Sequence, residues 1–192
     1  GLPGNTAIER ELKIRINRRD PYAFLYIDID NFKAFNDYFG YQKGDEIISY
    51  LAGILTKTVE KLGCKEDFIG HIGGDDFVLV TDPTRGQFMA KYIIDEFDKG
   101  AMLLLGEDEV ERGYFEVRTR QGETARVTLM SITIALVVST DNKIAHFAEI
   151  NDIASELKKY GKKVKGSVVI KERREITVDG NPEVVAEVEN TE

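Results

Sequence analysis

The feature that most restricts how this chain can fold is the segment 22–29, which reads Tyr-Ala-Phe-Leu-Tyr-Ile-Asp-Ile. Its apolar and aromatic side chains do not alternate with polar ones, as they would on a strand with one face in water. The segment therefore predicts a strand that is buried on both faces. Such a strand lies inside a sheet that other elements cover.

Apolar spacing and turn residues predict the elements around this strand. Helices are expected near residues 6–18, 45–59, 88–97 and 150–161, with Asn5 or Thr6 and then Asp45 as N-caps. Further strands are expected at 67–72, 77–81, 114–120, 126–138 and 167–171. Two hairpins result, across residues 73–76 and 121–123. Because helices and strands do not alternate strictly, the order indicates an α+β fold with an antiparallel or mixed sheet covered by helices.

Length and composition set the outer limits. The 192 residues suit one domain, 1–171, followed by an acidic tail, 172–192, that we expect to be flexible. Because the chain begins with Gly1 rather than Met, we expect a piece of a longer protein. The sequence has no run of about 18 apolar residues, the length that a membrane-spanning helix needs, so no such helix is predicted.

Charge and cysteine content bear on partners and compartment. The formal net charge of -8 argues against a broad nucleic-acid surface, although it leaves room for one bound nucleotide. The single cysteine, Cys64, excludes an internal disulfide and fits a reducing compartment, so we expect a cytoplasmic protein.

Two acids stand at the end of the buried strand. Asp28 and Asp30 are two positions apart, so they point to the same face of a strand. A carboxylate there is well placed to hold a cation. The alternative is that one acid caps the next helix while the other faces water, and for this pair alone that alternative is stronger.

A second acidic group lies in the first hairpin, where Gly73-Gly74-Asp75-Asp76-Phe77 joins two strands. The glycines permit a tight turn, and the adjacent acids repel each other unless a cation relieves them. Magnesium suits such acids because it prefers carboxylate oxygens and keeps positions open for phosphate. The alternative is an ordinary turn with solvated acids. If the strands are neighbours, Asp28, Asp75 and Asp76 meet, as metal-assisted phosphoryl chemistry requires.

Basic and amide side chains complete the candidate site. Lys33 follows the first strand, where backbone N–H groups at a helix start can hold phosphate. Asn36 and Asp45 flank a loop and could read the Watson–Crick edge of guanine. Lys158 and Lys162 are four apart and so share one helix face. Taken alone, Lys33, Lys158 and Lys162 read as solvated surface lysines, and Asp45 reads as a helix cap.

Together these motifs resemble the GGDEF domain, the catalytic module of diguanylate cyclases. The glycine-acid motif stands at residues 73–77, the Asp-x-Asp-x-Phe-Lys-x-x-Asn-Asp pattern at 28–37, the Gly-Asp pair at 44–45 and a Lys-x-x-Gly-Lys pattern at 158–162. Residues 1–3, Gly-Leu-Pro, are similar to the usual entry segment. The resemblance covers about residues 1–170. It implies a palm-like sheet of about five strands wrapped by helices, plus a small extra hairpin.

The resemblance also implies a role for each motif residue. Magnesium or manganese would be held by Asp28, the Ile29 carbonyl and Asp75. Asp76 would act beside the attacking 3′-hydroxyl as a metal ligand or base. Guanine would be read by Asn36 and Asp45. The β- and γ-phosphates would be bound by Asn31, Phe32 and Lys33, with Lys158 and Lys162.

Four positions depart from the family pattern. Asp76 replaces the usual Glu and reaches about one methylene less. His71 stands where an Arg is usual, which removes a permanent charge. Lys162 replaces an Arg, so the bidentate fork is lost. Cys64 replaces the Arg of the product-inhibition site, which leaves Asp67 alone there and predicts weak product inhibition.

The leading hypothesis is therefore an enzyme that condenses two GTP molecules into cyclic di-GMP. Two chains must face each other, so we expect a homodimer, and an upstream sensor or receiver domain in the full-length protein. The rival is a catalytically weak or inactive module that binds GTP or cyclic di-GMP. Retention of three acids favours catalysis, whereas His71 favours the rival.

Overall fold

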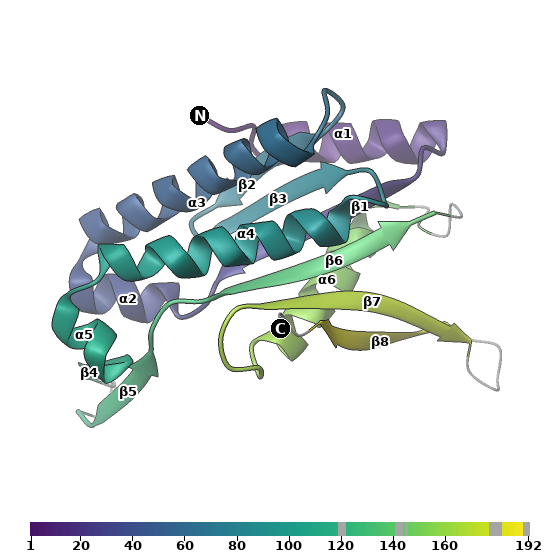
Figure 1. Cartoon of the computed structure of the whole chain (residues 1–192). Coiled ribbons are helices and arrows are strands. Elements are labelled where there is room, and N and C mark those ends of the chain that lie inside the picture. Colours follow the sequence, from purple (N-terminus) through teal and green to yellow (C-terminus); the bar gives the residue numbers. More distant parts are fainter. Residues whose placement is uncertain (119–121, 141–143, 145, 177–181, 190–192) are drawn as a thin grey trace.

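The computed structural model describes residues 1–118, 122–140, 144, 146–176 and 182–189. A six-stranded sheet lies at its centre (Figure 1). From one edge to the other its strands are β2 (Phe68–Gly73), β3 (Asp76–Thr81), β1 (Tyr22–Ile29), β6 (Ile132–Ser139), β7 (Val168–Ile176) and β8 (Pro182–Glu189). The β6–β7 pair is parallel and the other pairs are antiparallel, so the sheet is mixed, as predicted.

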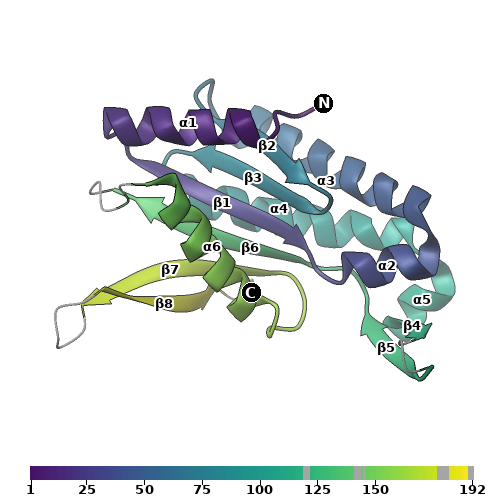
Figure 2. The same cartoon turned by 180° about the vertical axis from the view of Figure 1, so that it is seen from behind.

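Helices cover both faces of the sheet, as the buried strand requires (Figures 1 and 2). On one face, α3 (Tyr41–Leu62) and α4 (Gly86–Ala101) pack on β1 side chains such as Leu25. On the other face, α1 (Asn5–Arg18) and α6 (Phe147–Gly161) pack on the alternate side chains, such as Phe24. The segment 22–29 thus contributes to two separate cores.

A smaller unit lies beyond the sheet. It contains α2 (Phe32–Phe39), a 3-10 turn at Met102–Leu104, α5 (Glu107–Arg112) and the hairpin of β4 (Tyr114–Arg118) and β5 (Thr124–Thr128). Buried Phe115 fixes the hairpin, because its ring lies 6.4 Å from Phe35 and 5.6 Å from Phe39, centroid to centroid. The hairpin therefore packs on the helix that follows β1. Residues 119–121, part of its expected turn, lie outside the described residues.

Several sequence expectations need correction. The strand expected at 126–138 is two strands, β5 and β6, because the chain leaves one sheet and enters the other at 129–131. Helix α1 has Gly4 as its N-cap, not Asn5 or Thr6. Asp45 is no N-cap either, since α3 begins four residues earlier and Gly40 caps it.

The end of the chain also differs from expectation. The strand expected to stop at residue 171 continues to Ile176, and β8 pairs with it along its whole length. The described part of the expected tail is thus the end of β7 and a sixth strand, β8, at the sheet edge, while residues 177–181 and 190–192 lie outside the described residues. The division into a domain, 1–171, and a tail stays a prediction. Within the described ranges no helix has both the length and the apolarity to cross a membrane.

Candidate functional site

Strand pairing places the predicted acids together. Asp28 and Asp76 lie directly opposite each other on β1 and β3, and Asp75 precedes β3 in the hairpin. The turn depends on its glycines, because Gly73 and Gly74 have φ values of 141° and 57°, which side chains rarely adopt. The glycine-acid motif therefore holds one acid beside the end of the buried strand.

Lys158 of α6 and Lys162, the residue after this helix, form ion pairs with these acids. Lys158 Nζ lies 2.7 Å from Asp28 Oδ2 and 2.8 Å from Asp76 Oδ1, and Lys162 Nζ lies 3.0 Å from Asp28 Oδ1. The Lys162 contact is an ion pair without hydrogen-bond geometry, so Asp28 Oδ1 is buried without a hydrogen bond. We call Asp28, Asp76, Lys158 and Lys162 the Asp28 cluster.

Burial and charge shift the protonation of this cluster. Burial raises the pKa of Asp76, and the charge of Asp28 adds to the rise, although the hydrogen bond from Lys158 opposes it. Burial also raises the pKa of Asp75, with Asp28 and Asp76 adding to it. Burial lowers the pKa of Lys158, but the two carboxylates raise it by more, so its ammonium stays charged. The region concentrates the negative charge of Asp28, Asp75 and Asp76, which the two lysine ammonium groups only partly offset.

Asp30 does not share this environment. Its carboxylate accepts hydrogen bonds from Ser131 Oγ at 2.7 Å and Thr133 Oγ1 at 2.9 Å. It does not cap α2, whose N-cap is Asn31 without a side-chain bond, and it is half-buried at the wall of a cleft beside the acids. Asp30 is therefore tied to β6, while Asp28 turns toward α6.

The acids fit a hard cation only in part. Among the described residues no three acidic, histidine or cysteine side chains are grouped to hold a metal ion. Asp28 nevertheless offers a buried oxygen without a hydrogen bond, and the pair of acids already binds one cation, the Lys158 ammonium. The donors are carboxylate oxygens, which magnesium and manganese prefer. The residues fit such an ion if Lys158 moves and if the Ile29 carbonyl and substrate phosphates supply further oxygens.

A cleft of about 470 Å³ opens beside the acids. Six residues of the predicted site line this cleft: Ile29, Asn31, Phe32, Lys33, Asp75 and Lys162. Lys158 is absent from the lining residues. Lys163 and Lys165 line it as well, and neither belongs to the site predicted from the sequence. Both lie in the short segment between α6 and β7, next to the predicted Lys162.

The start of α2 forms one wall of the cleft. Asn31 precedes the helix with φ 60° and ψ 18°, a left-handed conformation that asparagine tolerates. Helix α2 has no side-chain cap bond at this end. Its first N–H groups thus remain for a ligand, and a helix N-terminus favours an anion.

The predicted guanine-reading residues lie farther along. Asn36 is on α2 and Asp45 is on α3, where it is exposed. Asn36 Oδ1 is buried without a hydrogen-bond partner, and a Cβ on Gly44 would lie only 1.9 Å from it. The absence of a side chain at Gly44 therefore makes room for Asn36. The joint role of Asn36 and Asp45 stays a prediction.

His71, the departure that raised most doubt, supports the hairpin itself. Its Nε2 lies 2.9 Å from the Gly74 carbonyl oxygen, within hydrogen-bond distance. Its ring stacks on Phe77, with centroids 4.3 Å apart. The side chain thus stabilises the acidic turn in place of the charge that an arginine would supply.

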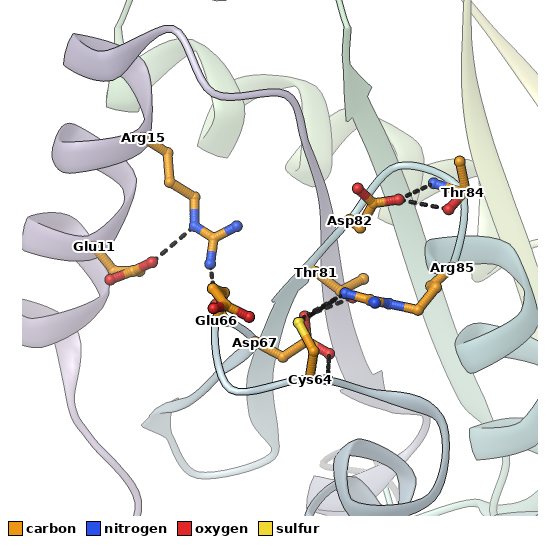
Figure 3. A network of polar contacts seen from close by, with 9 residues as sticks. All are labelled: Glu11, Arg15, Cys64, Glu66, Asp67, Thr81, Asp82, Thr84 and Arg85. Carbon is orange, nitrogen blue, oxygen red and sulfur yellow. Dashed lines mark hydrogen bonds and ion pairs between the residues drawn. The ribbon is translucent and has the colours of Figure 1, made fainter.

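The predicted product-inhibition site has a different arrangement from the one expected (Figure 3). Asp67 is not left alone, since Arg85 Nη2 lies 3.0 Å from its Oδ1. The same carboxylate accepts bonds from Thr81 Oγ1 at 2.9 Å, from the Cys64 N–H at 3.0 Å and from the Cys64 thiol at 3.5 Å. We call Cys64, Asp67, Thr81 and Arg85 the Asp67 cluster. No sequence pattern indicates a role for Arg85, which is 18 residues from Asp67 and approaches it only after β3 is followed by α4.

Strand-end acids beside a lysine-lined cleft, on a helix-covered mixed sheet, are typical of domains that act on nucleotide phosphates. The family model described as "Diguanylate cyclase, GGDEF domain" matches residues 1–126, which is more than half of the chain. The chain belongs to the GGDEF domain family, as the sequence motifs indicate.

Individual relatives agree with this assignment. A diguanylate cyclase of Vibrio cholerae is 39% identical over 67 residues, which is 35% of this chain and 20% of that protein. The chain spans 12% to 20% of the length of the curated relatives it matches.

Solved structures show the same fold at low sequence identity. The active GGEEF domain of a Vibrio cholerae diguanylate cyclase has a TM-score of 0.59 and 21% identity, covering 88% of this chain and 97% of that one. The GGDEF domain of DgcB from Caulobacter crescentus, in complex with c-di-GMP, has a TM-score of 0.61 and 16% identity, covering 88% and 91%. The palm-like architecture predicted from the sequence is confirmed, with β8 added.

Proposed function

We propose that this domain is a diguanylate cyclase, which condenses two GTP molecules into cyclic di-GMP and releases two pyrophosphates. The observation that carries the proposal is the pairing of Asp28 with Asp76 beside a lysine-lined cleft. Family membership and relatives named diguanylate cyclases support it. In this proposal the cleft takes the β- and γ-phosphates, on the α2 N-terminus and the lysines.

The chemistry is an in-line substitution at phosphorus. The 3′-oxygen of one GTP bonds to the α-phosphorus of the other, its proton leaves, and the bond to the α–β bridging oxygen breaks. A magnesium or manganese ion held by Asp28, the Ile29 carbonyl and Asp75 would lower the charge on the reacting oxygens. Asp76 would lie beside the 3′-hydroxyl as a further metal ligand or as a base, and Lys33 and Lys162 would orient the phosphates.

The reaction needs two domains, because each is proposed to bind one GTP. We therefore propose a homodimer as the active form, and an upstream sensor or receiver domain that controls its formation. A GTP-dependent domain with a free thiol at Cys64 suits the cytoplasm.

Product analysis tests this function. The domain is incubated with GTP and magnesium over a wide range of protein concentration, and cyclic di-GMP is measured by chromatography. The rate per subunit should rise with concentration, because dimerisation limits it. Absence of product even after fusion to a strong dimerisation domain would contradict the enzyme proposal.

One observation favours the alternative of a GTP-binding module without turnover. Asp76, the acid proposed to act on the 3′-hydroxyl, is held by Lys158. If that contact persists with GTP bound, the domain binds nucleotide and does not react. GTP binding by calorimetry, with no product from the dimerised domain, would identify this alternative.

A further inference from the structure

The Lys158 ammonium lies where two acids would hold a divalent cation. It contacts Asp28 at 2.7 Å and Asp76 at 2.8 Å, and those residues face each other across β1 and β3. Its side chain is only 16% exposed. An ammonium and a metal ion cannot both fill the space between the same two carboxylates, so one must displace the other.

The ring of Tyr26 also contacts this ammonium. Lys158 Nζ lies 4.3 Å from the centroid of the Tyr26 ring, within the range of a cation–π contact. Tyr26 is two residues before Asp28 on β1, so both side chains are on the face that α6 covers. The ring and the two acids thus surround Lys158 with groups that attract a cation.

We propose that Lys158, positioned by Tyr26, is a built-in cation that competes with divalent metal for Asp28 and Asp76. The inference rests on the proposed function, since it takes these acids as metal-binding residues. In the metal-free domain Lys158 stabilises the two carboxylates side by side. A metal ion binds there only when Lys158 leaves.

The position of Lys158 gives this exchange a consequence. Lys162 lines the 470 Å³ cleft, whereas Lys158 instead borders a separate pocket of about 290 Å³ together with Tyr26. Lys158 is therefore kept from the proposed phosphate site as long as it neutralises the acids. Metal binding frees the ammonium for phosphate, so metal and nucleotide should each strengthen the binding of the other.

Binding of Mn²⁺ alone, without nucleotide, tests the competition. Free Mn²⁺ is measured by electron paramagnetic resonance for the wild-type chain, Lys158→Met, Tyr26→Leu and Tyr26→Phe. We expect Lys158→Met to bind Mn²⁺ about tenfold more tightly, or ~1.4 kcal/mol. Tyr26→Leu should bind Mn²⁺ about threefold more tightly than Tyr26→Phe, because both variants lose the hydroxyl that hydrogen-bonds to Asp76 and only Tyr26→Leu loses the cation–π contact. Lys159→Met, one residue along α6, is the control for loss of a lysine and should match the wild type.

Two further measurements test whether the Mn²⁺ binds at Asp28 and whether the change in GTP binding is opposite to the change in Mn²⁺ binding. Adding Asp28→Asn to Lys158→Met should abolish the gain in Mn²⁺ affinity, and Lys158→Met should weaken GTP binding while it tightens Mn²⁺ binding. Unchanged or weaker Mn²⁺ binding by Lys158→Met overturns the proposal, as does a gain that survives Asp28→Asn. Equal Mn²⁺ binding by Tyr26→Leu and Tyr26→Phe overturns only the role of Tyr26. Cyclic di-GMP formation by the wild type is measured separately, so failure of the cyclase proposal and failure of the cation competition are distinguishable.

Discussion

The Asp28 cluster and the Asp67 cluster each pair a buried aspartate with a basic side chain, but they satisfy it differently. The side chains of Asp28 and Asp67 are only 5% and 1% exposed, so burial does not separate them. Four donor groups bond to Asp67. Asp28 has an oxygen without a hydrogen bond and shares Lys158 with a second acid.

The two clusters also differ in the type of basic side chain that pairs with the aspartate. Arg85 donates from a rigid planar group that also reaches the Cys64 sulfur at 3.1 Å, which suits a fixed contact. Lysine is a point charge on a flexible chain and exchanges partners more readily. The Asp67 cluster is therefore a structural contact, and the Asp28 cluster is arranged to exchange its cation. Hydrogen-bond satisfaction, rather than burial or charge, distinguishes the two.

The largest expected effect comes from removing an acid of the Asp28 cluster. Asp76→Ala should lower cyclic di-GMP formation by about 10²–10⁴-fold, the range for a positioned acid or base, because it acts mainly in the transition state. GTP affinity, measured by calorimetry without divalent metal, should stay close to that of the wild type, since the cleft is intact. An equal loss of GTP binding and turnover would place Asp76 in ground-state binding instead.

Removing the acid of the Asp67 cluster should have the opposite profile. Asp67→Ala leaves Arg85 and the Cys64 N–H without their acceptor, so the free energy of unfolding should fall by about 3 kcal/mol in urea. Asp82→Ala, which removes a half-buried acid that accepts hydrogen bonds from the Thr84 N–H and hydroxyl, is the control and should cost less, about 1 kcal/mol. Cyclic di-GMP binding should be weak before and after the change. Potent product inhibition that Asp67→Ala abolishes would show that the cluster opens to bind product.

The sequence predicts the part of this comparison that depends on local patterns. The apolar run at 22–27 predicts the buried strand and the glycines at 73–74 predict the hairpin. That Asp28 lies beside Asp76 follows only if these strands are neighbours, a condition that the two patterns leave open and the structure meets. The approach of Lys158 to those acids depends on how α6 lies across the sheet, which helical spacing does not specify. The same limit applies to Arg85, whose distance from Asp67 is set by tertiary packing.

Two expectations from the sequence differ from the structure, each for a local reason. The sequence around Asp45 resembles a helix start, but Gly40, with φ 87°, allows α3 to begin earlier. The last segment appears polar and acidic, yet it forms β8, because an edge strand needs only one partner strand and β7 supplies it. Composition alone therefore underestimates strands at a sheet edge.

The lysines between α6 and β7 test the role of the cleft beside the Asp28 cluster. Lys163→Gln with Lys165→Gln should weaken GTP binding about five- to thirtyfold at low salt, since each ammonium near a phosphate contributes ~0.5–1 kcal/mol. GMP, which lacks the β- and γ-phosphates, should be affected less, and added salt should reduce the difference. Lys159→Gln, which does not line the cleft, is the control in the same calorimetric titration. Equal weakening of GMP and GTP would place these lysines away from the terminal phosphates.

Substitution of Asp30 should have the smallest effect. It tests whether the hydrogen bonding of a half-buried carboxylate can be inferred from the pH dependence of the free energy of unfolding. It lies beside Asp28 in sequence but is bonded to Ser131 and Thr133, so it resembles Asp67 more closely. Burial raises its pKa above the ordinary value even though these two hydroxyl bonds oppose the rise. The folded state therefore holds the Asp30 proton more tightly than the unfolded state, and this contribution to stability is lost as pH rises from the ordinary aspartate pKa, about 4, through the raised one. Asp30→Asn removes that contribution, so in urea unfolding between pH 4 and pH 7 the variant should gain stability relative to the wild type as pH increases. A wild type that instead gains on the variant with rising pH would mean that the two hydroxyl bonds outweigh burial and lower the pKa of Asp30.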